Sequence, residues 1–133
     1  MSRTDKRAVA ESVENSVEKP PEKAIEAVLG RRLLKLLCRS DKESAEIYVF
    51  YGRDRSYVLI PKAFCGCKDF EINVVLRRER GSCYHLIALE LAIRRGVLRV
   101  LEVDCGTLRE VALELVLGEN SPTLRKIVRH LLP

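Results

Sequence analysis

Hydrophobic side chains recur at two different spacings along the chain, and these spacings predict helices and strands in turn. After a pair of prolines, apolar residues return every three or four positions, which predicts a helix over 22–38. The following segments, AEIYVFYG (45–52) and RSYVLIPKAF (55–64), are rich in β-branched and aromatic residues. They predict two strands that are joined as a hairpin by the polar turn between them.

The middle of the chain is expected to contain a further strand, a basic loop, a helix and a last strand. Alternating apolar residues at 70–74 predict a strand, and the arginine-rich loop after it ends at Gly81. The segment CYHLIALELAIRRG is apolar on most sides of a helix and stops at Gly96, so we expect a buried helix there. Residues 97–103 alternate again and predict a strand.

Two helices are expected at the end of the chain. Thr107 and Glu110 have the spacing of a capping box at the start of the first helix, which closes on a glycine. Ser121 is placed to cap the second helix, with a proline in the first helical position. The order of elements predicts one small α+β domain over 21–133, built on a short antiparallel sheet, with residues 104–133 as a C-terminal helical extension.

Residues 1–20 are polar, small and charged. Their valines stand four residues apart, which is a helical spacing, but they make only a narrow apolar face. We therefore expect a flexible tail that is transiently helical or helical against a partner. The segment lacks the layout of a signal peptide, and no apolar stretch of the chain reaches the ~20 residues of a spanning helix. These patterns predict a soluble, cytoplasmic protein.

The composition changes this picture in two respects. The formal net charge of +5 permits contact with nucleic acid without requiring it, because mixed charge is also typical of ordinary soluble domains. The chain has no glutamine, three asparagines and 32% charged residues, a balance typical of thermophilic proteins. Because intracellular proteins of hyperthermophilic archaea contain disulfides, a cytoplasmic location does not require all five cysteines to be reduced.

Three of the five cysteines and one of the two histidines fall in one short window. Cys65 and Cys67 form a C-x-C pair, Cys83 and His85 form a C-x-H pair, and residues 68–82 separate the pairs. Thiolate and imidazole are the ligands that zinc takes in tetrahedral structural sites. We therefore predict one structural Zn²⁺ held by all four side chains, with no open position for catalysis. A redox pair and ordinary buried thiols are the alternatives.

The remaining cysteines and the second histidine lie outside this window. Cys38 and Cys105 are expected to be small buried hydrophobic side chains, and a disulfide between them is the alternative. His130, in the last predicted helix, is expected to be a surface or packing residue.

The two ligand pairs resemble the pattern of the SWIM zinc finger, in which C-x-C is followed after a variable spacer by C-x-H. YVLIPKAFCGCKDF resembles the family's strand leading into C-x-C, and CYHLIALELA resembles its C-x-H helix. Ala88, three residues after His85, resembles the C-x-H-x-x-A extension of the Shu-complex SWIM subunit and its archaeal relatives. The resemblance covers about residues 46–95 and implies a zinc-stabilised ββα finger flanked by helices. The chain departs from many SWIM domains by having lysine where they have proline after the second cysteine.

This resemblance implies a non-enzymatic protein that binds a paralogue of the RecA-type recombinase in homologous recombination and DNA repair. The predicted helices offer more apolar face than one small sheet needs, which also favours a protein partner, and a homodimer stays open. The alternative for these helices is that they only close the core of this domain. The alternative is direct DNA binding through the loop between the ligand pairs, using Arg77, Arg78 and Arg80. An enzyme is not expected, because the sequence has no paired nucleophile and base, no phosphate-binding glycine pattern and no clustered carboxylates.

Overall fold

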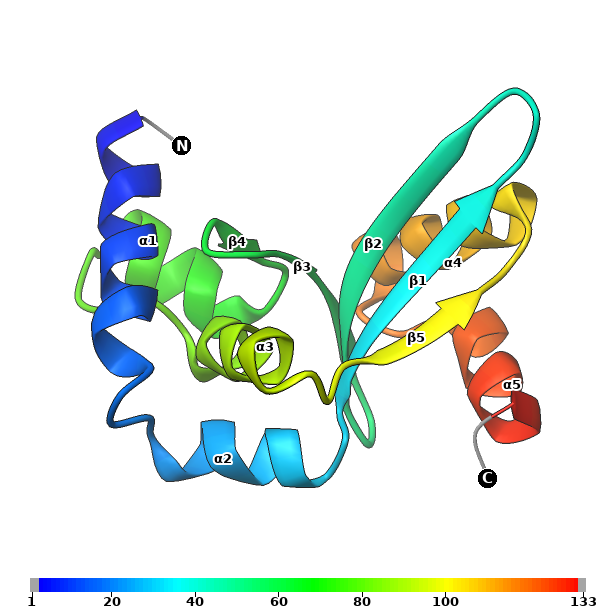
Figure 1. Ribbon diagram of the computed structural model, residues 1–133. Coiled ribbons are helices and arrows are strands. Elements are labelled where there is room, and N and C mark those ends of the chain that lie inside the picture. Colours follow the sequence, from blue (N-terminus) through cyan, green and yellow to red (C-terminus); the bar gives the residue numbers. More distant parts are fainter. Residues whose placement is uncertain (1–2, 132–133) are drawn as a thin grey trace.

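The computed structural model, which describes residues 3–131, is an α+β fold with one five-stranded sheet (Figure 1). The strands lie in the order β4-β3-β2-β1-β5. The first four pair antiparallel, as the sequence predicted, but β5 runs parallel to β1 because the chain returns to the sheet through a helical crossover. The strands are β1 (Leu33–Arg39), β2 (Ser44–Tyr51), β3 (Ser56–Ile60), β4 (Phe64–Cys65) and β5 (Arg99–Glu102).

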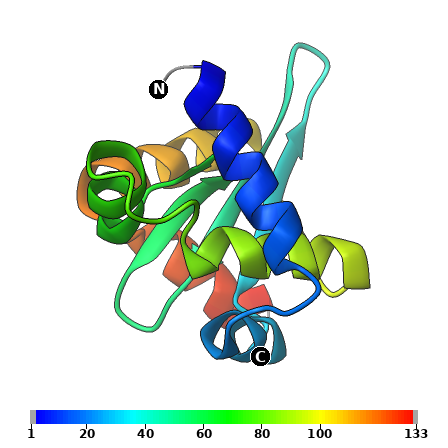
Figure 2. The ribbon, with the colours of Figure 1, turned by 90° about the vertical axis from the view of Figure 1, so that its left-hand side faces the viewer.

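Helices cover both faces of the sheet (Figures 1 and 2). One face carries α1 (Arg3–Ser16), α2 (Glu22–Leu29), the π-helix η1 (Phe70–Leu76) and α3 (Tyr84–Arg95). The other face carries α4 (Cys105–Gly118) and α5 (Pro122–Leu131). Each face has its own core, because successive residues of a strand point to opposite sides: Leu33 packs toward α3, while Leu34 and Leu36 pack toward α4 and α5.

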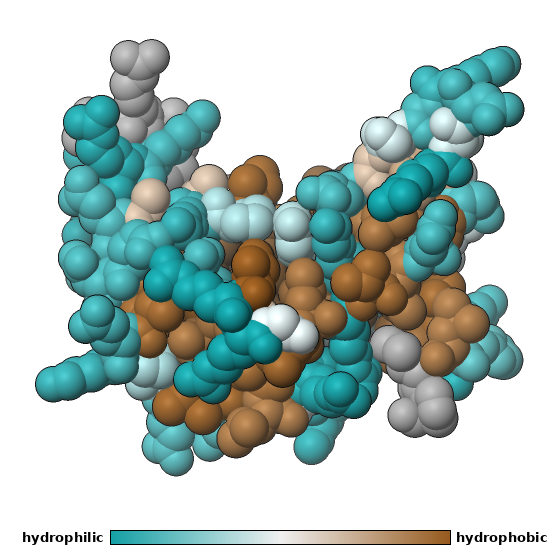
Figure 3. Space-filling model, in the orientation of Figure 1, coloured by the Kyte–Doolittle hydropathy of each residue, from teal (hydrophilic) through white to brown (hydrophobic). Residues whose placement is uncertain are grey.

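The tip of the β1–β2 hairpin extends beyond the helices. Figure 3 shows apolar surface in the middle of the molecule and hydrophilic surface on this tip. Residues 39–46 are all exposed, and the Lys35 ammonium pairs with the Glu46 carboxylate at 3.0 Å across the two strands. The hairpin is therefore held by strand pairing and polar contacts rather than by a core.

The predicted helix over 22–38 is wrong in its second half. Helix α2 ends at Leu29, Arg31 takes a left-handed conformation with φ 56°, and strand β1 begins at Leu33. The leucines that follow satisfy helical and alternating spacing equally well, so the pattern did not distinguish the two. Pairing with β2 on one side and β5 on the other decides for a central strand.

The strand predicted at 70–74 is also wrong, because this segment forms η1. Phe70 and Val74, four residues apart, are buried on one side of this helix, whereas Ile72 between them is 37% exposed. In a strand, Phe70, Ile72 and Val74 would all lie on one face. The four-residue spacing of a helix instead buries Phe70 and Val74 and leaves Ile72 on the outside. The segment therefore packs as a helical turn beside the ligand pairs instead of extending the sheet.

Several other elements confirm the sequence predictions. The hairpin β2–β3 and the strand β5 form where expected. Helix α3 is buried along most of its length and ends at Gly96, which has φ 66°. Ser121 caps α5, since its Oγ accepts a hydrogen bond from the Leu124 backbone N–H at 3.0 Å.

The predicted start of α4 needs correction. The helix begins at Cys105, before the expected capping box, because the Asp104 carboxylate accepts the Thr107 backbone N–H at 2.8 Å. The helix ends at Gly118, as predicted, and the residue that follows it, Glu119, is left-handed with φ 55°. The predicted helix is therefore present but starts two residues earlier.

Residues 3–16 form helix α1 instead of the flexible tail predicted for 1–20. Val9 and Val13 are 2% and 0% exposed and belong to the core that contains α3. A narrow row of valines suffices to hold α1 in place, because α3 is apolar on nearly every side and buries its outer face against them. A flexible tail was predicted because α1 by itself has few apolar side chains. The contact of these side chains with the apolar side of α3 is not visible in the sequence of α1.

An ion network reinforces this contact between α1 and α3. Glu14 of α1 pairs with Lys62 and, at 2.7 Å, with Arg94 of α3. The buried Glu90 carboxylate lies 3.2 Å from Arg94 and 3.7 Å from Lys62. Hydrogen bonds from Lys62 and Arg94 lower the pKa of Glu14 to about 2.

Glu14→Gln is expected to loosen the docking of α1 at neutral pH. A lowered carboxyl pKa stabilises the folded state above the ordinary value of 4.5, and this contribution is lost as pH falls toward about 2. Amide exchange of α1 should therefore be faster in the variant than in the wild type at pH 7, and equal in both near pH 2. Glu11→Gln, an exposed change on the same helix, is the matched control. Equal exchange at pH 7 would contradict the prediction.

Gly52→Ala is expected to lower the free energy of unfolding by about 1–3 kcal/mol. Gly52 is buried in the β2–β3 turn, and an added Cβ would collide with the Arg55 carbonyl oxygen. Gly118→Ala is the control, because a Cβ there meets no atom within 4 Å. Chemical denaturation of both variants is the measurement, and equal midpoints would rule out the proposed collision.

Cys38 and Cys105 form a disulfide, which was the alternative left open by the sequence. It joins β1 to the first residue of α4, with 5.0 Å between the two Cα atoms. Both sulfurs lie in the core on the α4–α5 side of the sheet. Among the described residues, no helix is both long and apolar enough to cross a membrane.

Candidate metal centre

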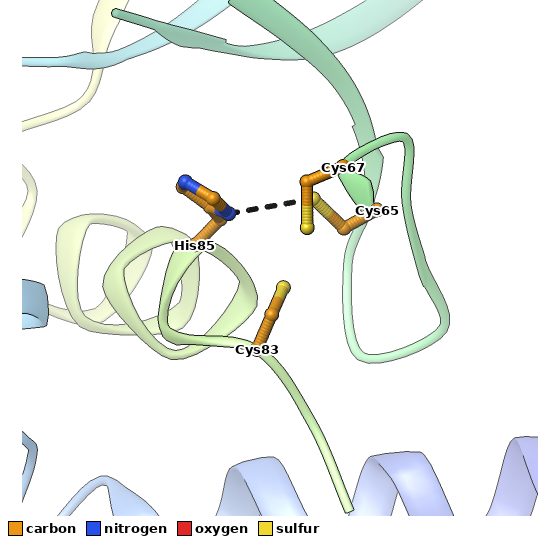
Figure 4. A group of neighbouring side chains, drawn as sticks. All are labelled: Cys65, Cys67, Cys83 and His85. Carbon is orange, nitrogen blue, oxygen red and sulfur yellow. Dashed lines mark hydrogen bonds between the residues drawn. The ribbon is translucent and has the colours of Figure 1, made fainter. Parts of the chain in front are cut away.

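The four predicted ligands come from two local structures that meet beside the sheet (Figure 4). Cys65 ends β4 and Cys67 follows the turn after it. Cys83 is the N-cap of α3, and His85 lies in the first turn of that helix. The hydrogen bond from the Gly66 backbone N–H to the Val58 carbonyl, at 3.0 Å, ties the C-x-C turn to β3.

Gly66 separates the two cysteines of the C-x-C pair. The chain does not use left-handed backbone there, and a Cβ would meet the Val58 backbone at an ordinary 3.7 Å. The reversal is made by strand pairing and the start of η1, so the turn does not depend on glycine.

The ligand atoms of the four residues lie within 4.8 Å of one another, and all four residues are buried. The Cys65 Sγ and the His85 Nδ1 are 3.7 Å apart. A tetrahedral ion with ligands at about 2.0–2.3 Å requires ligand atoms roughly 3.5–3.8 Å from each other. This group could therefore hold a metal ion with little rearrangement.

Two helix N-termini point backbone N–H groups at the sulfurs. The Phe70 N–H, at the start of η1, donates to the Cys67 Sγ at 3.3 Å. The Cys83 sulfur accepts a backbone hydrogen bond from Leu86 in the first turn of α3. Such N–H groups and the positive ends of helices stabilise negative charge on sulfur.

The three thiols cannot all ionise together without a cation. Hydrogen bonds from Cys65 and Cys83 lower the pKa of Cys67, so one thiolate is favoured there. The pKa of Cys65 is raised by its hydrogen bonds to Cys67 and Cys83 and by burial. For Cys83, a hydrogen bond from Cys65 lowers the pKa, but Cys67 and burial outweigh it and raise the value to about 12. Three closely spaced thiols would carry several negative charges if they ionised together, and a cation bound among them would neutralise these charges.

Aromatic rings fix the orientation of the His85 imidazole. The ring centroids of Phe50, Tyr57 and Tyr84 lie 4.3, 5.2 and 4.0 Å from that of His85. In Figure 4 one ring nitrogen points toward the sulfurs and the other points away. Phe50 and Tyr57 were not among the residues predicted for the site. Their inward positions on paired strands, Phe50 opposite Tyr57, are the pattern that could have indicated it.

The predicted nucleic-acid residues lie in the exposed loop between η1 and α3, beside α1 (Figure 1). The Arg80 guanidinium contacts both oxygens of Asp69 at 2.9 and 3.0 Å. Arg78 has left-handed backbone with φ 54°, and Arg77 is exposed. Gly81 abuts Ser12 of α1 so closely that a Cβ would collide with it. The structure therefore keeps Arg77, Arg78 and Arg80 in one loop but places Arg80 in an internal ion pair.

Comparisons of the chain with protein-family models, curated proteins and solved structures give no significant match.

Proposed function

We propose that Cys65, Cys67, Cys83 and His85 bind one Zn²⁺ and that the chain is a non-enzymatic zinc protein. The observation that carries the proposal is the burial of four ligand atoms within 4.8 Å of one another. Three sulfurs and one imidazole suit zinc better than magnesium or calcium, which prefer oxygen ligands. Four protein ligands complete a tetrahedron, so the ion has no position for substrate or water and its role is structural.

Zinc at this position would join parts of the chain that otherwise make few contacts. The first pair of ligands belongs to the edge strand β4 and the turn into η1, and the second pair belongs to the start of α3. Strand β4 has only two residues, too few for stable pairing by themselves. The metal would therefore fix η1 and the loop after it relative to α3.

Elemental analysis and native mass spectrometry of the purified protein test the metal. One zinc per chain is expected, and Co²⁺ in its place should give the intense visible absorption of tetrahedral thiolate coordination. A folded protein that contains no metal and takes up neither ion would disprove the site.

We further propose that the chain binds a RecA-type recombinase paralogue and acts in homologous recombination and DNA repair. The resemblance of the two ligand pairs to the SWIM pattern supports this. The outer side of α4 supports a protein partner independently, because Leu113, Val116 and Leu117 are 59%, 71% and 77% exposed at helical spacing. Exposed apolar side chains that cluster in this way are typical of contact surfaces.

Co-purification with a RecA-fold paralogue from the same genome tests the partner. Replacing Leu113, Val116 and Leu117 with serine should abolish co-purification. Leu29→Ser with Leu76→Ser is the control, because these leucines are 74% and 71% exposed on other elements. Retained binding by the α4 variant would reject α4 as the contact surface, and failure of the wild type to bind would reject the partner.

A further inference from the structure

A second group of cations lies at the end of the molecule where α2 leads into β1, β2 turns into β3, and α5 packs. In Figures 1 and 2 the α2–β1 connection and the β2–β3 turn lie at the bottom of the view, and α5 lies in its lower half. Figure 3 shows hydrophilic surface at the lower centre, over the β2–β3 turn. We call this surface the basic end; its cations are Arg31, Arg32, Arg53, Arg55, Arg125, Lys126 and Arg129.

Direct contacts hold the three segments together around Tyr51. The Arg32 Nη1 donates to the Tyr51 carbonyl at 3.3 Å. The Arg125 guanidinium lies over the Tyr51 ring, 4.5 Å from its centroid. Arg125 also donates to the Ser56 hydroxyl at 3.5 Å, which connects α5 to the start of β3. The cations are therefore brought together by the fold and not by neighbourhood in sequence.

The basic end carries an excess of positive charge. Its carboxylates are Asp54 in the turn, Glu119, which pairs with Arg55 at 3.6 Å, and Glu114, which interacts electrostatically with Lys126. Seven cations against three carboxylates leave a formal charge of +4 on this surface. An excess of positive charge on one surface attracts an approaching polyanion.

Three of these cations remain available for an external partner. Arg53, Lys126 and Arg129 are exposed, and none of them makes a close ion pair with the side chains that the structure describes, although Lys126 also interacts with Glu114. Arg80 in the loop 77–80 differs in this respect, because Asp69 binds its guanidinium through both carboxylate oxygens. The basic end therefore presents three exposed cations to a phosphate, whereas Asp69 already occupies one arginine of the loop.

A cavity of about 340 Å³ opens beside Arg32. The rings of Phe50 and Tyr84 line it, together with Lys23 and Glu26, whose charges oppose each other. The Lys23 ammonium lies 5.8 Å from the centroid of the Tyr84 ring. Proteins that bind single strands place cations next to aromatic rings on which unpaired bases stack. Here the half-buried Tyr84 ring offers such a face, whereas Phe50 is buried behind it.

We propose that the basic end binds the sugar–phosphate backbone of a single-stranded nucleic acid, with an unpaired base entering the cavity beside Arg32. The interaction requires neither a metal ion at the metal centre nor a protein partner. The proposal can therefore be tested independently of the zinc site and of the recombinase partner.

The test is fluorescence anisotropy with labelled single-stranded DNA and RNA of one sequence, and with the corresponding DNA duplex, between 0.05 and 0.5 M salt, a range of about tenfold. The wild type should bind a single strand with salt-dependent affinity and bind the duplex more weakly. Replacing Arg53, Lys126 and Arg129 with alanine should weaken binding roughly a hundredfold at about 0.1 M salt and reduce the log–log salt slope by about 2. The two single strands separate a DNA ligand from an RNA ligand.

The charge-matched control replaces Arg77, Arg78 and Arg80 with alanine and should leave affinity within about threefold of the wild type, the size of a general charge effect. Circular dichroism and zinc content must be unchanged in both variants. A larger loss in the loop variant than in the basic-end variant would overturn the proposal. So would preference for the duplex, or binding only to vesicles of anionic phospholipid.

Discussion

Cys83→Ser is expected to eliminate stoichiometric zinc and to lower the free energy of unfolding by more than about 4 kcal/mol. Cys83 caps α3 and faces the other three ligands, so its loss leaves an incomplete site in a buried position. Zinc binding to such a site contributes directly to folding, because the ligands are not assembled in the unfolded chain. Zinc content and chemical denaturation of the same preparation measure the two effects together.

The two histidines of the chain offer a matched control for this result. His85→Ala should weaken zinc binding and stability, whereas His130→Ala, an exposed change near the end of α5, should alter neither. Removing the metal with a chelator should increase amide exchange in η1 and the start of α3 first. Exchange in α4 should change least, because α4 packs in the other core. Full zinc content in Cys83→Ser, or equal effects of both histidine variants, would refute the assignment.

Removing the disulfide by Cys38→Ala with Cys105→Ala is expected to lower the free energy of unfolding by about 4 kcal/mol. The bond connects residues that are 67 positions apart, and closing so long a loop restricts the unfolded chain strongly. It also attaches α4 to the central strand β1 at a point where the two cysteines are 1% and 8% exposed. The midpoint of chemical denaturation, compared between the oxidised wild type and the double variant, gives the magnitude.

Reducing agent supplies the control for the disulfide. It should lower the stability of the wild type and leave the double variant unchanged. Under denaturing, metal-free and non-reducing conditions the wild type should expose the three thiols of Cys65, Cys67 and Cys83. Titration of five thiols under these conditions would show that the bond is absent.

The grouping of Cys65, Cys67, Cys83 and His85 was predictable, because each pair is a local pattern whose spacing brings its two side chains close together. C-x-C beside a strand and C-x-H at a helix start place all four side chains with little help from the rest of the chain. The aromatic rings around His85 come from two strands and one helix, so only the pairing of β2 with β3 brings them together. The hairpin itself was predicted, but its register, which places Phe50 opposite Tyr57, was not.

Other features depended on long-range contacts. The spacing of the leucines in β1 is compatible with a helix, and it is the pairing with β2 and β5 that makes this segment a strand. The valines of α1 are too few to predict a stable helix by themselves, and their contact with α3 is what holds the helix in place. The cations of the basic end are spread over three segments, so no single run of arginines indicated them, while the loop at 77–80 did form such a run. A run of charged residues in a sequence indicates a solvent-exposed surface more often than it indicates a binding surface.

The two faces of the sheet separate the five cysteines into two chemically distinct sets. Cys65, Cys67 and Cys83 lie in one core, and Cys38 and Cys105 lie in the other. During biosynthesis, a nascent chain with five unprotected thiols could be oxidised into many incorrect isomers. A metal that occupies the first set early would leave a single pair for the oxidant, so the order of metal loading and oxidation would determine the yield of correctly assembled protein.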